Sequence, residues 1–60
     1  MSEISILDLQ NLRHLIGGYN TTHEKMMDYA SKAEDQQVKK LFQDAADGAM
    51  KNKQDLMKFL

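Results

Sequence analysis

The sequence has no cysteine, no proline and no tryptophan, and only three glycines in 60 residues. Without cysteine, disulfides and thiolate metal sites are excluded, and nothing indicates an oxidising compartment. Two histidines cannot form a Cys2His2-type zinc site without cysteines. The absence of proline and the scarcity of glycine also remove the usual signals for tight turns and β-hairpins.

An excess of charge of one sign and long hydrophobic runs are also missing. Eight basic and nine acidic residues give a net charge of −1. The two signs are interspersed, whereas a nucleic-acid binder carries a clustered basic patch. No segment reaches the roughly 20 apolar residues of a membrane span, and residues 1–5 do not resemble the start of a signal peptide. We therefore expect a cytoplasmic protein that binds neither nucleic acid nor membrane, with no evident small-molecule substrate.

The residues that dominate are good helix formers, namely Ala, Leu, Met, Lys, Gln and Glu, and they predict an all-α protein. Ser5 is the expected N-cap of a helix over about residues 5–33. Steps of three and four then predict an inner seam. Its positions are Leu9, Leu12, Ile16, Tyr19, His23, Met26, Ala30 and Ala33. Leu15, Met27 and Tyr29 widen this stripe, as in a helix that packs against more than one neighbour.

A second helix is expected over about residues 36–59. The pattern breaks at residues 33–35, where Asp35 can cap the new helix. The spacing resumes at Val38, Leu41, Phe42, Ala45, Ala49, Leu56 and Phe59. On the polar side we expect the ion pairs Asp35–Lys39 and Asp47–Lys51, each worth a few tenths of a kcal/mol. The short connection predicts one antiparallel helical hairpin as a single domain over residues 1–60.

A hairpin of this length has too little interior to fold well alone. A 60-residue chain buries only about 60% of its unfolded surface, and oligomerisation is the remedy that remains without disulfides. We predict a homodimer in which two hairpins form a four-helix bundle by isologous contacts. The predicted interface is Leu9, Leu12, Ile16, Gly17, Met26, Phe42, Ala45, Ala49, Leu56 and Phe59. We interpret the helical pair Gly17 and Gly18 as a point where a neighbouring helix approaches closely at the dimer interface, or as a mild kink.

Tyr19, His23 and Asn52 fall on or near the inner seams and predict a polar layer in an otherwise apolar bundle. Such a layer fixes register and partner choice at some expense in stability. We interpret His23 as a partly buried histidine hydrogen-bonded to a tyrosine or an asparagine. The segment HEKMM at residues 23–27 lacks the second histidine of a zinc-protease motif, and no nucleophile–base arrangement is present. We expect no catalytic residue, no cofactor and no enzymatic activity.

The segments IGGY (residues 16–19), YASKA (29–33), LF (41–42) and LMKFL (56–60) resemble a ferritin-like half-bundle. The resemblance is to the rubrerythrin-like and spore coat protein F-like family of spore-forming bacteria. In metal-binding relatives the first helix supplies a Glu and the second a Glu-x-x-His, which together hold two iron or manganese ions. The resemblance places Tyr19 at the first Glu, Ala49 at the second Glu and Asn52 at the His. It therefore implies the fold without its metal site.

The expected function is that of a non-catalytic structural or assembly protein. By resemblance its setting is the spore coat or the sporulating cell, where a homodimeric bundle contacts other coat or structural proteins. Two alternatives remain open. One is a vestigial ferritin-like metal-binding or oxidative-stress module that uses His23, Glu24 or outer carboxylates. The other is a small adaptor that presents an apolar groove to a partner helix and stays monomeric or weakly dimeric until that partner binds.

Overall fold

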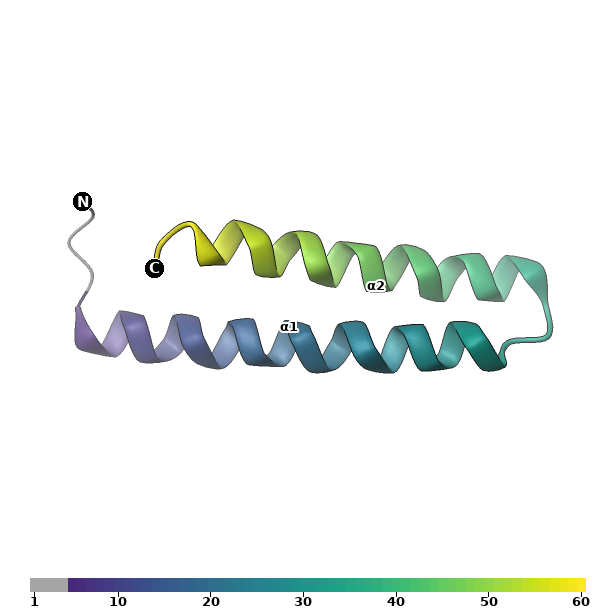
Figure 1. Cartoon of the computed structure of the whole chain (residues 1–60), viewed down its shortest axis with the longest axis horizontal. Coiled ribbons are helices and arrows are strands. Elements are labelled where there is room, and N and C mark those ends of the chain that lie inside the picture. Colours follow the sequence, from purple (N-terminus) through teal and green to yellow (C-terminus); the bar gives the residue numbers. More distant parts are fainter. Residues whose placement is uncertain (1–4) are drawn as a thin grey trace.

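A computed structural model describes residues 5–60. Residues 1–4, which belong to the expected domain and to the segment judged not to be a signal peptide, lie outside the described residues. Helix α1 (Ile6–Lys32) and helix α2 (Gln36–Met57) run antiparallel, and the connection between them lies at one end of the molecule (Figure 1). The predicted all-α helical hairpin is therefore confirmed. Neither described helix has the length and hydropathy needed to cross a membrane.

Polar side chains fix where the two helices begin. Ser5 Oγ accepts a hydrogen bond from the backbone N–H of Asp8 at 3.0 Å. Asp35 Oδ1 accepts hydrogen bonds from the N–H groups of Gln37 and Val38 at 2.8 and 3.0 Å. These bonds satisfy N–H groups that have no partner within the first turn of a helix. Both predicted N-caps are confirmed.

The ion pairs on the surface are not the predicted ones. Asp35 acts as a cap and Lys39 is half-buried, so the pair Asp35–Lys39 does not form, and neither does Asp47–Lys51. Those two predictions were wrong. Between residues 5 and 60, the ion pairs are Asp28–Lys32, Lys40–Asp44 and Asp55–Lys58. All of them are exposed, so they contribute little to stability.

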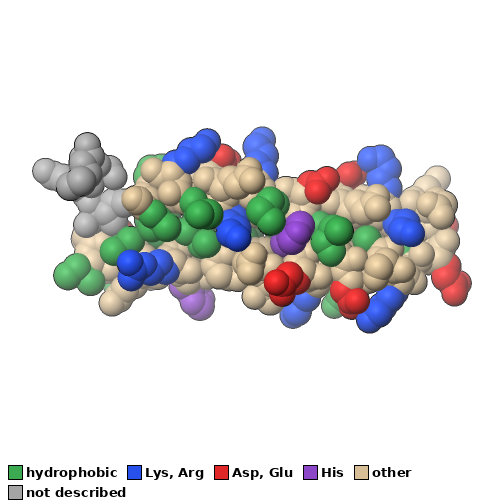
Figure 2. Space-filling view, viewed as in Figure 1, with side chains coloured by type: hydrophobic (Ala, Val, Ile, Leu, Met, Phe, Trp, Pro, Cys, Tyr) green, Lys and Arg blue, Asp and Glu red, His purple; other side chains and the backbone are tan. Residues whose placement is uncertain are grey.

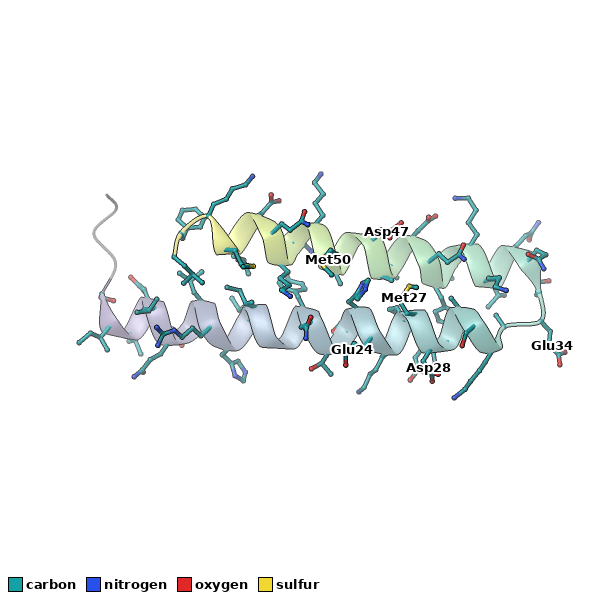
Figure 3. The ribbon with its side chains drawn as sticks, viewed as in Figure 1. Glu24, Met27, Asp28, Glu34, Asp47 and Met50 are labelled. Atoms are coloured by element: carbon teal, nitrogen blue, oxygen red, sulfur yellow. The ribbon has the colours of Figure 1, made fainter. Side chains whose placement is uncertain are left out.

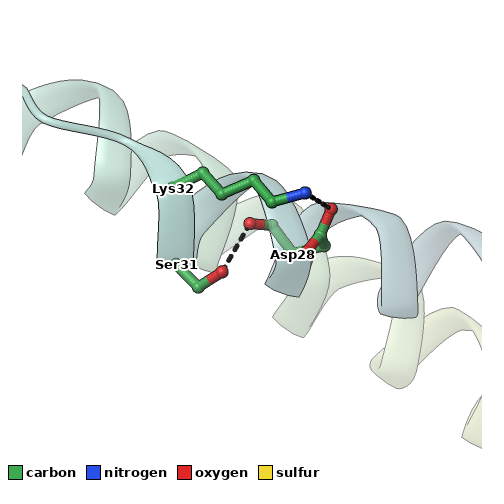
Figure 4. A network of polar contacts seen from close by, with 3 residues as sticks. All are labelled: Asp28, Ser31 and Lys32. Carbon is green, nitrogen blue, oxygen red and sulfur yellow. Dashed lines mark hydrogen bonds and ion pairs between the residues drawn. The ribbon is translucent and has the colours of Figure 1, made fainter.

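A small polar network closes the last turn of α1 (Figure 4). Ser31 Oγ donates to the backbone carbonyl oxygen of Asp28 at 2.7 Å, and Lys32 Nζ donates to the carboxylate of Asp28 at 2.9 Å. The hydrogen bond and the negative charge of Asp28 raise the pKa of Lys32. A lysine in this turn also interacts favourably with the negative end of the helix dipole. The network therefore lies in the last turn of α1, and the chain leaves the helix at Ala33.

Helix α1 contacts α2 through the seam that its sequence predicts. All eight seam positions from Leu9 to Ala33 are buried or half-buried. Leu15, Met27 and Tyr29 remain 49%, 47% and 45% exposed. These are the three residues that widen the apolar stripe. Because α2 covers these side chains only in part, the hairpin leaves part of the apolar surface of α1 facing solvent.

Helix α2 is turned relative to its predicted seam. Leu41 is 65% exposed and Ala45 is also exposed, whereas Ala46 is fully buried. The α2 positions that are buried or half-buried are Lys39, Phe42, Ala46, Ala49, Met50, Lys53 and Leu56. Two lysines can lie in this seam because their aliphatic stems pack against apolar surface while the ammonium groups reach water. As a result, part of the apolar stripe of α2 points away from α1.

The hairpin has almost no core of its own. Within the described part of the chain, the buried residues are three alanines, Ala30, Ala46 and Ala49, and no large side chain is fully buried. Ten large hydrophobic side chains are between 42% and 77% exposed. Hydrophobic burial is the main favourable contribution to folding. The described hairpin therefore makes little use of the apolar residues that it contains.

Candidate functional site

Two polar contacts join α1 to α2 across the seam. His23 Nδ1 lies 2.9 Å from the carbonyl oxygen of Ala46. Because a carbonyl oxygen can only accept, the proton of this bond belongs to Nδ1 of the imidazole. Lys53 Nζ donates to Oδ1 of Asn20 at 3.1 Å. Both bonds are partly buried, and together they fix the register of the two helices.

These contacts differ from the predicted polar layer. Tyr19 and His23 are half-buried, but Asn52 lies on the exposed side of α2. The predicted partner of His23 was wrong, since the imidazole binds the backbone of Ala46, whose small side chain lets the two helices approach. Sequence reasoning also missed Lys53, although positions 49, 53 and 56 keep the spacing of three and four. A layer completed by Asn52 in a bundle of two copies stays a prediction.

The positions that the resemblance connects with metal carry no assembled set of ligands in the hairpin. Ala49 is buried and has no donor atom in its side chain. No three His, Asp or Glu side chains in the described range 5–60 lie close enough together to hold a metal ion. Glu24 and Asp28 point away from α2, and Asp47 points away from α1 (Figure 3). The predicted absence of a metal and a cofactor stays a prediction.

Apolar residues from both helices meet on one side of the hairpin. A shallow groove of about 350 Å³ lies near its open end, and it is lined by Asp8, Asn11, Leu12, Leu15, Leu56 and Phe59. Near the connection, the rings of Tyr29 and Phe42 lie 5.3 Å apart between centroids, within the range of favourable aromatic pairs. Tyr29 comes two heptads after Leu15, and Phe42 comes two heptads before Leu56. Since that spacing returns to nearly the same side of a helix, the groove and the ring pair belong to one face.

Extending both stripes in steps of three and four defines a surface that we call the neutral face. On α1 it consists of Leu12, Leu15, Tyr19, Thr22, Met26 and Tyr29. On α2 and just beyond it consists of Val38, Leu41, Phe42, Ala45, Ala49, Asn52, Leu56 and Phe59. Charged residues make up 28% of the chain, yet none occurs at these positions; Asp8, one turn before Leu12, lines the groove at the end of this face. The neutral face thus runs the length of the hairpin and uses both helices.

The other side of the hairpin has a different character. Met27 lies there in a shallow depression whose remaining lining residues are Gln36, Lys39, Lys40, Gln43, Asp44 and Asp47. We call this depression the polar face. In the view of Figure 2, hydrophobic side chains follow the line between the two helices and are interrupted by basic side chains and a histidine. Charged side chains thus line the polar face, whereas the positions of the neutral face carry none.

The two consecutive glycines do not mark a close approach inside the hairpin. A Cβ atom added at Gly17 or Gly18 would have no neighbour within 4 Å. Gly18 lines a shallow hollow together with His14, Leu15, Tyr19 and Thr22, beside the neutral face. Gly17 follows Leu15 by two residues and thus lies about 200° around the helix from it. The two glycines therefore face different surroundings.

The fold and these two faces define the chain as an all-α helical hairpin with one uncharged and one charged side. No protein-family model, no curated protein and no solved structure matches the chain.

Proposed function

We propose that the chain is a non-catalytic structural or assembly protein that acts as a homodimeric four-helix bundle. The observation that carries this proposal is the missing interior, since among residues 5–60 three alanines are buried while ten large apolar side chains are exposed. A second layer of helices over the neutral face would bury five of these ten, namely Leu15, Tyr29, Val38, Leu41 and Phe59. Assembly would then be the condition for a stable fold as well as the purpose of the protein.

The area of exposed surface supports the same proposal. The accessible surface of the chain is 4887 Å². A compact monomer of 6.9 kDa would expose about 4000 Å² according to the usual dependence on mass. The excess of about 900 Å² is close to the area of roughly 800 Å² that each partner buries in a standard interface. The excess is thus of the size that one further copy would bury.

We further propose a ferritin-like arrangement of the bundle and a role among coat or structural proteins of a sporulating cell. The support is the resemblance of segments on both helices to rubrerythrin-like and spore coat protein F-like sequences. Tyr19, Ala49 and Asn52 stand where metal-binding relatives carry carboxylate and imidazole ligands, which favours a structural role over metal chemistry. Comparison of spores with and without the protein, by electron microscopy of the coat, tests this setting, and an unchanged coat would argue against it.

Solution mass and helix content, measured together, test the homodimer. We expect sedimentation equilibrium at micromolar concentration to give twice the 6.9 kDa of the chain, with high helix content by circular dichroism. Because folding would be linked to association, the melting temperature should rise with protein concentration. A fully helical protein of single-chain mass with a sharp, concentration-independent melting transition would overturn the proposal. A poorly helical monomer that folds only on addition of another protein would favour the adaptor alternative.

A further inference from the structure

We infer that the neutral face is the surface on which a second copy of the chain packs. This inference rests on the proposed homodimer and specifies which side of the hairpin forms it. The neutral face keeps seven of the ten predicted interface residues and leaves out Leu9, Ile16 and Gly17. The polar face, with Met27 and its charged neighbours, remains in contact with solvent or with later partners. Three observations support the assignment.

The first observation is the rotation of α2. Its large apolar residues do not all point toward α1, since Leu41 is 65% exposed and Val38 is 42% exposed. The seam instead accepts Lys39 and Lys53, which are half-buried. In this orientation Leu41 and Val38 lie on the neutral face, where α1 leaves them exposed. A second layer of helices over the neutral face would bury the apolar residues that this orientation of α2 leaves exposed.

The second observation is the distribution of charge. The positions of the neutral face carry none of the charged residues of the chain, although these form 28% of it, and Asp8 is the one charged residue that lines the adjoining groove. Depletion of charge, with aromatic residues retained, is the compositional mark of the centre of a protein interface. The neutral face has both properties, because Tyr19, Tyr29, Phe42 and Phe59 all lie on it. The polar face, by contrast, includes the ion pair Lys40–Asp44.

The third observation identifies the occupant. The hairpin measures 47 × 15 × 9 Å between Cα atoms, and the neutral face draws on both helices along this length. A single helix with its side chains is only about 10–12 Å wide, so one partner helix in the middle would leave the outer apolar residues uncovered. A second hairpin has the same width, the same length and the same lack of charge. A two-fold pairing of two neutral faces therefore covers the surface without a separate partner.

A pair of substitutions on α1 tests this assignment. Leu15→Glu places a charge on the neutral face, and Leu7→Glu places the same charge in the first turn of α1, outside that face. Burying an unpaired carboxylate is strongly unfavourable, so we expect Leu15→Glu to raise the dimer dissociation constant by about 100-fold or more. Leu7→Glu should leave it within about threefold, because a carboxylate near a helix N-terminus is tolerated. Sedimentation equilibrium measures both constants.

Thiol labelling tests the same point without a disruptive charge. The chain has no cysteine, so a single introduced thiol reports on one site. Ala45→Cys lies on the neutral face and Gln43→Cys on the polar face, and both positions are exposed in the hairpin. In the dimer we expect a maleimide to react with Cys at position 45 about tenfold or more slowly than at position 43, because local opening must precede the reaction.

The possible results separate this inference from the proposed function. A wild-type dimer with weakened Leu15→Glu, unchanged Leu7→Glu and selective protection at position 45 supports the inference. A wild-type dimer in which Leu15→Glu associates normally and position 45 labels as fast as position 43 overturns it and leaves the homodimer intact. A folded wild-type monomer overturns both. Protection that arises only after a different protein is added overturns the choice of occupant.

Discussion

Leu41 and Leu7 offer a closely matched comparison, because both are helical leucines and both are 65% exposed in the hairpin. Leu41 belongs to the neutral face and Leu7 does not. We predict that Leu41→Ala weakens dimerisation strongly and that Leu7→Ala does not. Both substitutions raise intrinsic helix propensity by the same small amount. Any difference between the two variants therefore reports on what covers each position.

The expected magnitude follows from exposure. Full burial of a leucine side chain is worth about 1.5–3 kcal/mol. A second copy would cover the 65% of Leu41 that remains exposed. Leu41→Ala would then remove about 1–2 kcal/mol of dimerisation free energy per copy on that scale. A two-fold dimer contains the position twice, which gives about 2–4 kcal/mol in total. At about 1.4 kcal/mol per factor of ten, the dissociation constant should rise roughly 30- to 1000-fold.

The assay is a dilution series followed by circular dichroism, with sedimentation equilibrium at selected concentrations. Leu41→Ala should lose helix content at a protein concentration at least tenfold higher than wild type, whereas Leu7→Ala should follow the wild-type curve within about threefold. If both variants shifted the concentration at which helix content is lost by the same factor, the two exposed leucines would be equivalent. That result would refute the assignment of Leu41 to the dimer interface. An unchanged curve for Leu41→Ala would have the same consequence.

Three further perturbations have defined expectations. Asp35→Ala removes the cap of α2 and should lower the free energy of unfolding by about 1 kcal/mol in urea titrations at fixed protein concentration; Glu34→Ala is the control, and equal effects would count against the cap. Asn52→Leu should stabilise the dimer while broadening its NMR spectrum, because it removes a polar group that fixes register; a loss of stability would contradict a polar layer that contains Asn52. Ala46→Leu should lower the free energy of unfolding by about 1–3 kcal/mol through overpacking. Ala46 is fully buried, and His23 contacts its backbone. A stabilised variant would show that the seam is loosely packed.

The sequence predicted α1 more accurately than α2, for a physical reason. Each predicted seam position of α1 is buried or half-buried. The apolar residues of α2 occupy about half of the helix circumference, an arc that runs from Leu41 on one side to Met50 on the other. Periodicity alone could not tell which part of that arc faces α1, so Leu41 and Ala45 were placed inward and Ala46 was missed. The predicted ion pair Asp35–Lys39 was wrong because the carboxylate of Asp35 caps α2 instead.

In the candidate site, too, the sequence predicted positions but not their partners. The residues Tyr19, His23 and Asn52 were recognised as polar positions near the seam from spacing, but their partners depend on how close the two backbones approach. A backbone carbonyl such as that of Ala46 has no signature in a sequence, so the bond from His23 could not be predicted. Lys53 was passed over because a charged residue is not usually assigned to a seam, although its long aliphatic stem makes this possible.

By itself, the sequence determined that the chain is helical, where each helix begins and that the connection is short. These properties depend on local propensity, capping side chains and the spacing of apolar residues, which act over a few positions. Only the tertiary structure decided how far α2 is rotated about its axis and therefore which apolar residues remain uncovered. That rotation reflects competition among all contacts along the seam, including the bonds of His23 and Lys53, and no local pattern encodes the outcome.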